Sequence, residues 1–105
     1  MARKTFVINA DKARNLSFTI NTLIEIEEYF SKPIGEVMDS MSELNFKTLR
    51  TLFYFGLKWE DKDLTEIQAG EALEEAINNM TMNEVASTLA RAMTVSIGAS
   101  MPPSE

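Results

Sequence analysis

The acidic residues between positions 61 and 72 come closest to a pattern with known chemistry. Asp61 and Asp63 are spaced like the first ligands of a calcium-binding loop. Such a loop needs a glycine at its sixth position and a bidentate glutamate at its twelfth, where this chain has Glu66 and Ala72. The sequence therefore predicts a charged turn that leads into a helix, and no metal site.

Two groups of glutamates on predicted helices raise the question of acid–base catalysis. In the first group, Glu25, Glu27 and Glu28 splay around the helix and cannot converge on one point. In the second group, Glu71 and Glu75 are neighbours one turn apart. A catalytic pair of carboxylates needs a pocket that shifts the pKa of one of them, and an exposed helix face provides none. Both groups are therefore interpreted as solvated helix faces.

The side chains that most enzymes use are missing from this sequence. The chain contains no histidine and no cysteine, which removes the commonest general base, the commonest metal ligand, thiolate metal sites and disulfides. It has no nucleophile motif of the G-x-S-x-G or S-x-x-K type, and its scattered glycines form no phosphate-binding loop. We predict a non-enzymatic protein without metal or cofactor, in a reducing compartment.

Length and charge narrow the class of protein further. A chain of 105 residues predicts a single domain. Its net charge of −6 is opposite to that of a domain that binds nucleic acid, so nucleic acid is not an expected partner. The apolar run Phe6–Ile8 is too short for a signal segment or a membrane span. We expect a cytoplasmic protein that makes no membrane contact.

The elements that position these side chains begin with a predicted β-hairpin over residues 5–20. Leu16–Ile20 alternates apolar and polar residues as a half-buried strand does. Thr5–Asn9 is rich in β-forming residues that can pair with it, and the polar segment Ala10–Asn15 is expected to turn.

From residue 22 the apolar residues repeat with the period of a helix, and local signals mark where helices start and stop. Capping boxes are predicted to begin helices at Thr22, Thr65 and Thr81. Pro33 is expected as the first residue of the second helix, and Gly98 ends the last one. The predicted fold is mainly α, with the hairpin (5–20) followed by a compact bundle of about five helices (22–98). Residues 1–98 form one domain, and residues 99–105 are predicted to be a flexible tail.

The third helix, predicted from residue 45 or 46 to residue 59, combines an apolar arc with a basic face. Lys47, Arg50, Tyr54 and Lys58 fall together on the basic face. The arc that is expected to be buried consists of Phe46, Leu49, Leu52, Phe53, Gly56, Leu57 and Trp59. The run Leu52–Phe55 is apolar on all sides, so this helix is either central to the bundle or partly covered by a partner.

Residues 44–59 include basic side chains and no acidic ones, although the whole chain is acidic. One interpretation is intramolecular, with the basic face meeting the acidic fourth helix. The other is a docking surface with an aromatic anchor and an arginine, which are residue types enriched at binding hot spots. The candidate partner-binding residues are Lys47, Arg50, Tyr54, Phe55, Lys58 and Trp59.

Three segments carry a resemblance to a known family. Asn21–Glu28 (NTLIEIEE) opens a helix after a short strand, and Leu49–Leu57 (LRTLFYFGL) places leucines before aromatic residues and a glycine. Leu64–Gly70 (LTEIQAG) opens the helix that leads to the last one. With these segments, residues 18–97 resemble the small tail assembly chaperones of long-tailed bacteriophages and phage-like prophage elements.

This resemblance implies a function and its partners. Such chaperones are expected to coat the long, aggregation-prone tape measure protein in the cytoplasm of the bacterial host and to help recruit tail tube protein. They leave before the virion is complete, and many have a longer form made by ribosomal frameshifting. Self-association is consistent with coating a long client. The competing interpretation is a small acidic regulator, such as an anti-repressor or a nucleic-acid mimic, which needs a dense acidic face.

Overall fold

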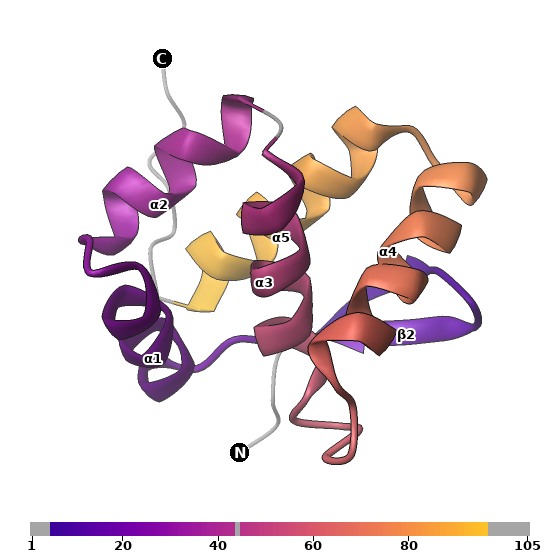
Figure 1. Ribbon diagram of the computed structural model, residues 1–105, viewed down its shortest axis with the longest axis horizontal. Helices are drawn as coiled ribbons and strands as arrows, with labels where there is room; N and C mark the ends of the chain where they lie inside the picture. Colours follow the sequence, from indigo (N-terminus) through magenta and orange to yellow (C-terminus); the bar gives the residue numbers. More distant parts are fainter. Residues whose placement is uncertain (1–4, 44, 97–105) are drawn as a thin grey trace.

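The computed structural model describes residues 5–43 and 45–96, which form a two-stranded antiparallel hairpin followed by five α-helices (Figure 1). The predicted fold class is confirmed. The elements are β1 (Phe6–Asn9), β2 (Ala13–Leu16), α1 (Ile20–Phe30), α2 (Ile34–Ser40), a 3-10 turn η1 (Met41–Glu43), α3 (Phe46–Leu57), α4 (Glu66–Asn79) and α5 (Met82–Ser96).

The second strand lies earlier in the chain than the alternation at residues 16–20 predicted. β2 pairs with β1 in a register that places Leu16 opposite Phe6 and Ala13 opposite Asn9. After Leu16 the backbone leaves the hairpin, because the Ser17 amide donates to the Gly56 carbonyl of α3 at 2.9 Å. The prediction of a strand from 16 to 20 was therefore wrong, and a contact far away in sequence is the reason.

The first helix also starts earlier than predicted, at Ile20. Its N-cap is Thr19, whose hydroxyl accepts a hydrogen bond from the Thr22 amide at 3.2 Å. The predicted cap at Thr22 was wrong, since Thr22 already lies inside the helix. At the next junction Pro33 is extended and precedes α2, so the helix starts one residue after the predicted position.

The two later capping boxes are confirmed. In α4 the Thr65 hydroxyl accepts from the Gln68 amide at 3.1 Å, and the Gln68 side chain accepts from the Thr65 amide at 3.0 Å. In α5 the same reciprocal pair joins Thr81 and Glu84, at 3.1 and 3.0 Å. Each box satisfies two backbone donors that a helix start otherwise leaves unpaired.

α3 runs through the middle of the molecule (Figure 1). The helices α1 and α2 lie on one side of it and α4 on the other, while α5 crosses behind it in this view. The buried core follows from this arrangement, because α3 contacts α1, α4, α5 and β2 at once. α3 ends at Leu57, two residues before the predicted end, and the next residues form a turn.

Two points remain, on the lengths of the described helices and on the predicted C-terminal end of the fold. None of the helices within residues 5–43 and 45–96 is long and apolar enough to cross a membrane. The predicted helix end at Gly98 and the predicted tail, residues 99–105, lie outside the described residues.

Candidate functional site

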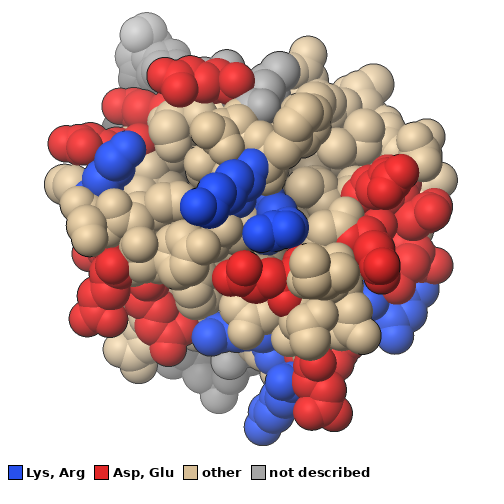
Figure 2. Space-filling model, viewed as in Figure 1, with Lys and Arg blue, Asp and Glu red and all other residues tan. Residues whose placement is uncertain are grey.

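The outward side of α3 carries the basic face that the sequence predicted. Lys47, Arg50, Tyr54 and Lys58 follow one another at helical spacing and keep part of their surface exposed. We call these four residues the α3 face. Figure 2 shows basic side chains near the centre of the molecule, over α3, with acidic side chains around them. The inward residues are almost completely buried: Thr48, Leu49, Thr51, Leu52, Phe53, Phe55, Gly56 and Leu57.

Phe55 is covered by its neighbours and contributes little to this surface. Only 8% of it is exposed. The Tyr29 ring meets its ring edge-on with centroids 6.1 Å apart, and the Lys58 Nζ atom lies 4.8 Å from its centroid. The same Nζ is 3.3 Å from a carboxylate oxygen of Glu25 in α1. Phe55 therefore supports the α3 face from below, and Lys58 already has an intramolecular partner.

Trp59 lies in the turn after α3 and binds the hairpin. Its indole nitrogen donates a hydrogen bond of 2.9 Å to the backbone carbonyl of Asn15. A buried or half-buried indole N–H needs such an acceptor. The structure therefore separates Trp59 from the α3 face, although it was one of the candidate partner-binding residues.

Arg50 lies across the neighbouring helix α4. Its Nη2 atom is 3.7 Å from a carboxylate oxygen of Glu66, and a Cβ atom at Gly70 would come within 3.0 Å of the Arg50 Cδ. The intramolecular interpretation thus holds for Arg50, which meets the acidic fourth helix, whereas Lys58 meets α1. Lys47 forms no ion pair with any residue in the described part of the chain.

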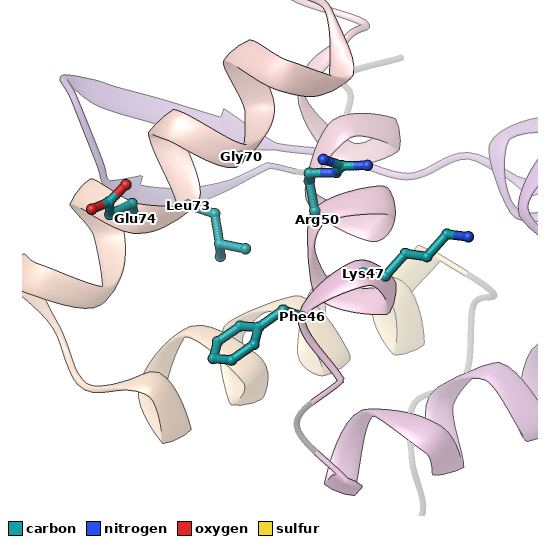
Figure 3. A pocket seen from close by; sticks show the side chains of 6 residues that line it. All are labelled: Phe46, Lys47, Arg50, Gly70, Leu73 and Glu74. Atoms are coloured by element: carbon teal, nitrogen blue, oxygen red, sulfur yellow. The ribbon is translucent and has the colours of Figure 1, made fainter.

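A hollow of about 520 Å³ lies between α3 and α4, and we call it the α3–α4 groove. In Figure 3 the Phe46 ring and the Leu73 side chain point toward each other, and the Lys47 side chain points away from α4. The residues that line the groove are Phe46, Lys47, Arg50, Gly70, Leu73 and Glu74.

Phe46 was predicted to be buried, and this was wrong, since 63% of it is exposed. Phe53 lies two turns further along on the same side of α3 and is fully buried. The periodicity identified the correct side of the helix, but Phe46 is the first residue of α3, where the covering elements end.

Ile67 is a second exposed apolar residue near the groove, with 64% of it exposed. It shares one side of α4 with Gly70 and Glu74, at positions i, i+3 and i+7. It was not among the residues predicted to bind a partner. The available signal was its position off the buried stripe of that helix, which leaves a large apolar side chain in solvent.

A second hollow, on the hairpin side of α4, is lined by charged residues. Arg14 is buried there and holds Asp11 through two hydrogen bonds of 2.7 and 2.9 Å, with Asp61 3.6 Å away. Hydrogen bonds from the guanidinium lower the pKa of Asp11, and the paired carboxylate raises the pKa of Arg14. Asp61, the first residue of the sequence that imitates a calcium loop, thus pairs with Arg14.

The described residues include no group of three or more histidine, cysteine, aspartate or glutamate side chains that could hold a metal ion. Comparisons with protein families, with curated proteins and with solved structures find no match to this chain. What the geometry offers is an outward basic and aromatic face beside a groove with apolar walls, which is an arrangement suited to binding a protein segment.

Proposed function

We propose that this chain is a tail assembly chaperone of a long-tailed bacteriophage or prophage element. In this proposal it binds the tape measure protein through the α3 face and assists tail tube assembly without catalysis. The observation that carries the proposal is the partly exposed α3 face beside the α3–α4 groove, on a helix whose sequence resembles that family.

The physical demands of this task agree with the surface. A coat protein needs solubilising charge, and this chain has a net charge of −6. It also needs apolar and aromatic side chains to shield a helical client, and Phe46 and Tyr54 are available on or beside the α3 face. The groove is an open hollow rather than an enclosed cavity, which suits binding weak enough for tail tube protein to displace the chaperone. The proposed setting is the cytoplasm of the bacterial host, with no place in the mature virion.

Co-expression with the tape measure protein of the same phage element tests the proposal. We chose Tyr54→Ala combined with Lys47→Glu, because Lys58 is paired with Glu25 and its replacement would also disturb the fold. The double variant should leave less of the tape measure protein soluble and should capture less of it than the unaltered chain does.

A matched control removes an exposed apolar side chain and reverses a lysine outside the α3 face, Val7→Ala with Lys32→Glu. This control changes the net charge by the same amount, so the tape measure protein should stay as soluble as with the unaltered chain. Circular dichroism spectra verify that both variants fold. If the tape measure protein is equally soluble with both variants, the α3 face is not its binding surface. If the unaltered chain fails to bind it, the chaperone proposal is wrong.

A second candidate function is a small acidic regulator that binds a DNA-binding protein. The observation in its favour is the set of carboxylates around the second hollow, where Glu71, Glu74 and Glu75 of α4 lie near Asp61. The basic side chains of the α3 face interrupt the acidic surface in Figure 2, which weakens mimicry of nucleic acid. Titration against a basic DNA-binding domain distinguishes the two, since only the regulator should compete with DNA.

A further inference from the structure

The α3–α4 groove has two rims of opposite charge and an apolar floor. Lys47 and Arg50 form the rim on α3, and Glu74 belongs to the rim on α4. Between them lie Phe46 and Leu73, which point toward each other in Figure 3. Figure 2 shows the same pattern on the surface, with an uncharged strip between basic side chains over α3 and acidic side chains over α4.

The two rims lie on opposite sides of the groove, with Lys47 and Arg50 on α3 and Glu74 on α4. Arg50 lies over Gly70 of α4. A two-fold axis that runs along the groove exchanges its two sides. A second copy turned about that axis would therefore place its basic rim over the acidic rim of the first copy, and its acidic rim over the basic rim of the first.

We propose that the α3–α4 groove is the contact surface of a two-fold symmetric dimer, in which the basic rim of each copy meets the acidic rim of the other. The exposed Phe46 rings would close over the apolar floor and Ile67 would lie at the edge of the contact. Such an isologous contact pairs residue i with residue j and residue j with residue i.

The charges favour a second copy over other occupants. Arg50 already has Glu66 within reach in its own chain, but Lys47 and Glu74 form no ion pair with another described residue. A uniformly acidic segment would be repelled by Glu74, and a uniformly basic one by Lys47. The groove fits a partner that carries both signs at the same spacing, and the chain itself is such a partner. A net charge of −6 per copy also means that copies repel unless they meet through a locally matched surface.

This inference goes beyond the proposed function and does not rest on it, because its test needs no client. Sedimentation velocity of the unaltered chain should show a monomer–dimer equilibrium between micromolar and millimolar concentration. K47E introduces a negative charge into the α3 rim opposite Glu74 of the other copy, and E74K introduces a positive charge into the α4 rim opposite Lys47 of the other copy. For each variant alone, the dissociation constant of the dimer should rise at least about tenfold, since each dimer contains two repelling pairs in place of two attracting ones.

Mixing the two variants is the decisive experiment. In a mixed dimer the glutamate introduced at position 47 faces the lysine introduced at position 74, and the unaltered Glu74 faces the unaltered Lys47. An equimolar mixture should therefore associate about as strongly as the unaltered chain, although neither variant does so alone. The double variant K47E/E74K should also recover its self-association.

Two further variants test whether the effect is specific to the charged and apolar residues of the groove. K32E changes an exposed lysine between α1 and α2 and should leave the dimer unchanged. F46S removes the exposed ring and should weaken the dimer without unfolding the chain. A monomeric unaltered chain, a dimer that ignores both charge reversals, or a mixture that fails to associate would overturn the inference. Capture of the tape measure protein by the unaltered chain and by E74K, which lies outside the α3 face, is a separate readout, so the chaperone proposal can fail or hold independently.

Discussion

The two ends of α3 differ in how far neighbouring elements cover them, although both belong to one helix with basic and apolar residues. At the C-terminal end, the hairpin packs against Gly56 and accepts a hydrogen bond from Trp59. At the N-terminal end, Phe46 is mostly exposed and Lys47 has no ion-pair partner among the described residues. We call these the closed end and the open end of α3.

The difference shows that a helix acquires a binding surface where its packing partners run out. The closed end is covered by three elements: β2, α1, and the turn that follows α3. Its aromatic residues are therefore part of the core. The open end presents Phe46 and Lys47 to solvent beside the α3–α4 groove. Stability should therefore depend on the closed end, and association on the open end.

The largest expected effect separates two phenylalanines on the same side of α3. Phe53→Ala should lower the free energy of unfolding by about 4 kcal/mol, because it empties space around a fully buried ring. Phe46→Ala should change it by no more than about 0.5 kcal/mol, because the ring is mostly solvent-exposed. Urea denaturation followed by circular dichroism measures both. Equal losses at the two positions would break the distinction between the ends.

A pair of glycines gives the next largest effect. A Cβ at Gly56 would come within 2.7 Å of the Phe18 ring and 2.8 Å of Leu16, so Gly56→Ala should cost about 1–3 kcal/mol despite its better helix propensity. A Cβ at Gly70 would meet only the flexible Arg50 side chain, at 3.0 Å. Gly70→Ala should therefore be neutral or stabilising by up to about 1 kcal/mol.

Thermal unfolding of the two glycine variants measures this contrast. The unaltered chain is the reference, and far-UV circular dichroism confirms that each variant keeps its helices. A Gly56→Ala variant as stable as the unaltered chain would mean that the hairpin can move away from α3, which contradicts a rigid closed end.

The same contrast explains how far the sequence could predict this fold. The capping boxes at Thr65 and Thr81 were predicted correctly, because all of their partners lie within four residues. The end of the hairpin was not, because it depends on the Ser17 amide bonding to Gly56 across the molecule. A local pattern cannot indicate where the backbone finds a distant acceptor.

The candidate site divides along the same line. Helical periodicity placed Lys47, Arg50, Tyr54 and Lys58 on one face correctly, since it depends only on spacing. The periodicity could not distinguish Phe46 from the buried apolar residues, because burial at a helix end depends on how far its neighbours extend. Trp59 was predicted both on the buried arc of this helix and among the candidate partner-binding residues, but the helix ends two residues before it.

A smaller effect tests the hydrogen bond that attaches the hairpin to the closed end. Trp59→Phe keeps an aromatic ring but removes the donor to the Asn15 carbonyl, so it should lower the free energy of unfolding by about 1–2 kcal/mol. Tyr54→Phe removes a hydroxyl from the α3 face and should change it by less than about 0.5 kcal/mol. Circular dichroism is the measurement, because Trp59 is the only tryptophan and its loss removes the fluorescence signal. A loss that is no larger for Trp59→Phe than for Tyr54→Phe would show that the indole hydrogen bond does not hold the hairpin.

The smallest expected effect depends on pH and concerns Asp11, which pairs with Arg14 beside the turn that follows α3. Because hydrogen bonds from Arg14 lower the pKa of Asp11 in the folded chain, its contribution to stability is present above the ordinary value of 3.8 and is lost as the pH falls through the lowered value. Asp11→Asn should therefore cost about 1 kcal/mol or less near neutral pH, because the carboxylate is partly exposed and screened by solvent. Urea denaturation should show this cost shrinking toward zero below the ordinary pKa of Asp11. If the loss in free energy of unfolding for Asp11→Asn persisted unchanged in acid, Asp11 would act through the shape of the hairpin turn. The ion pair with Arg14 would then not stabilise the closed end.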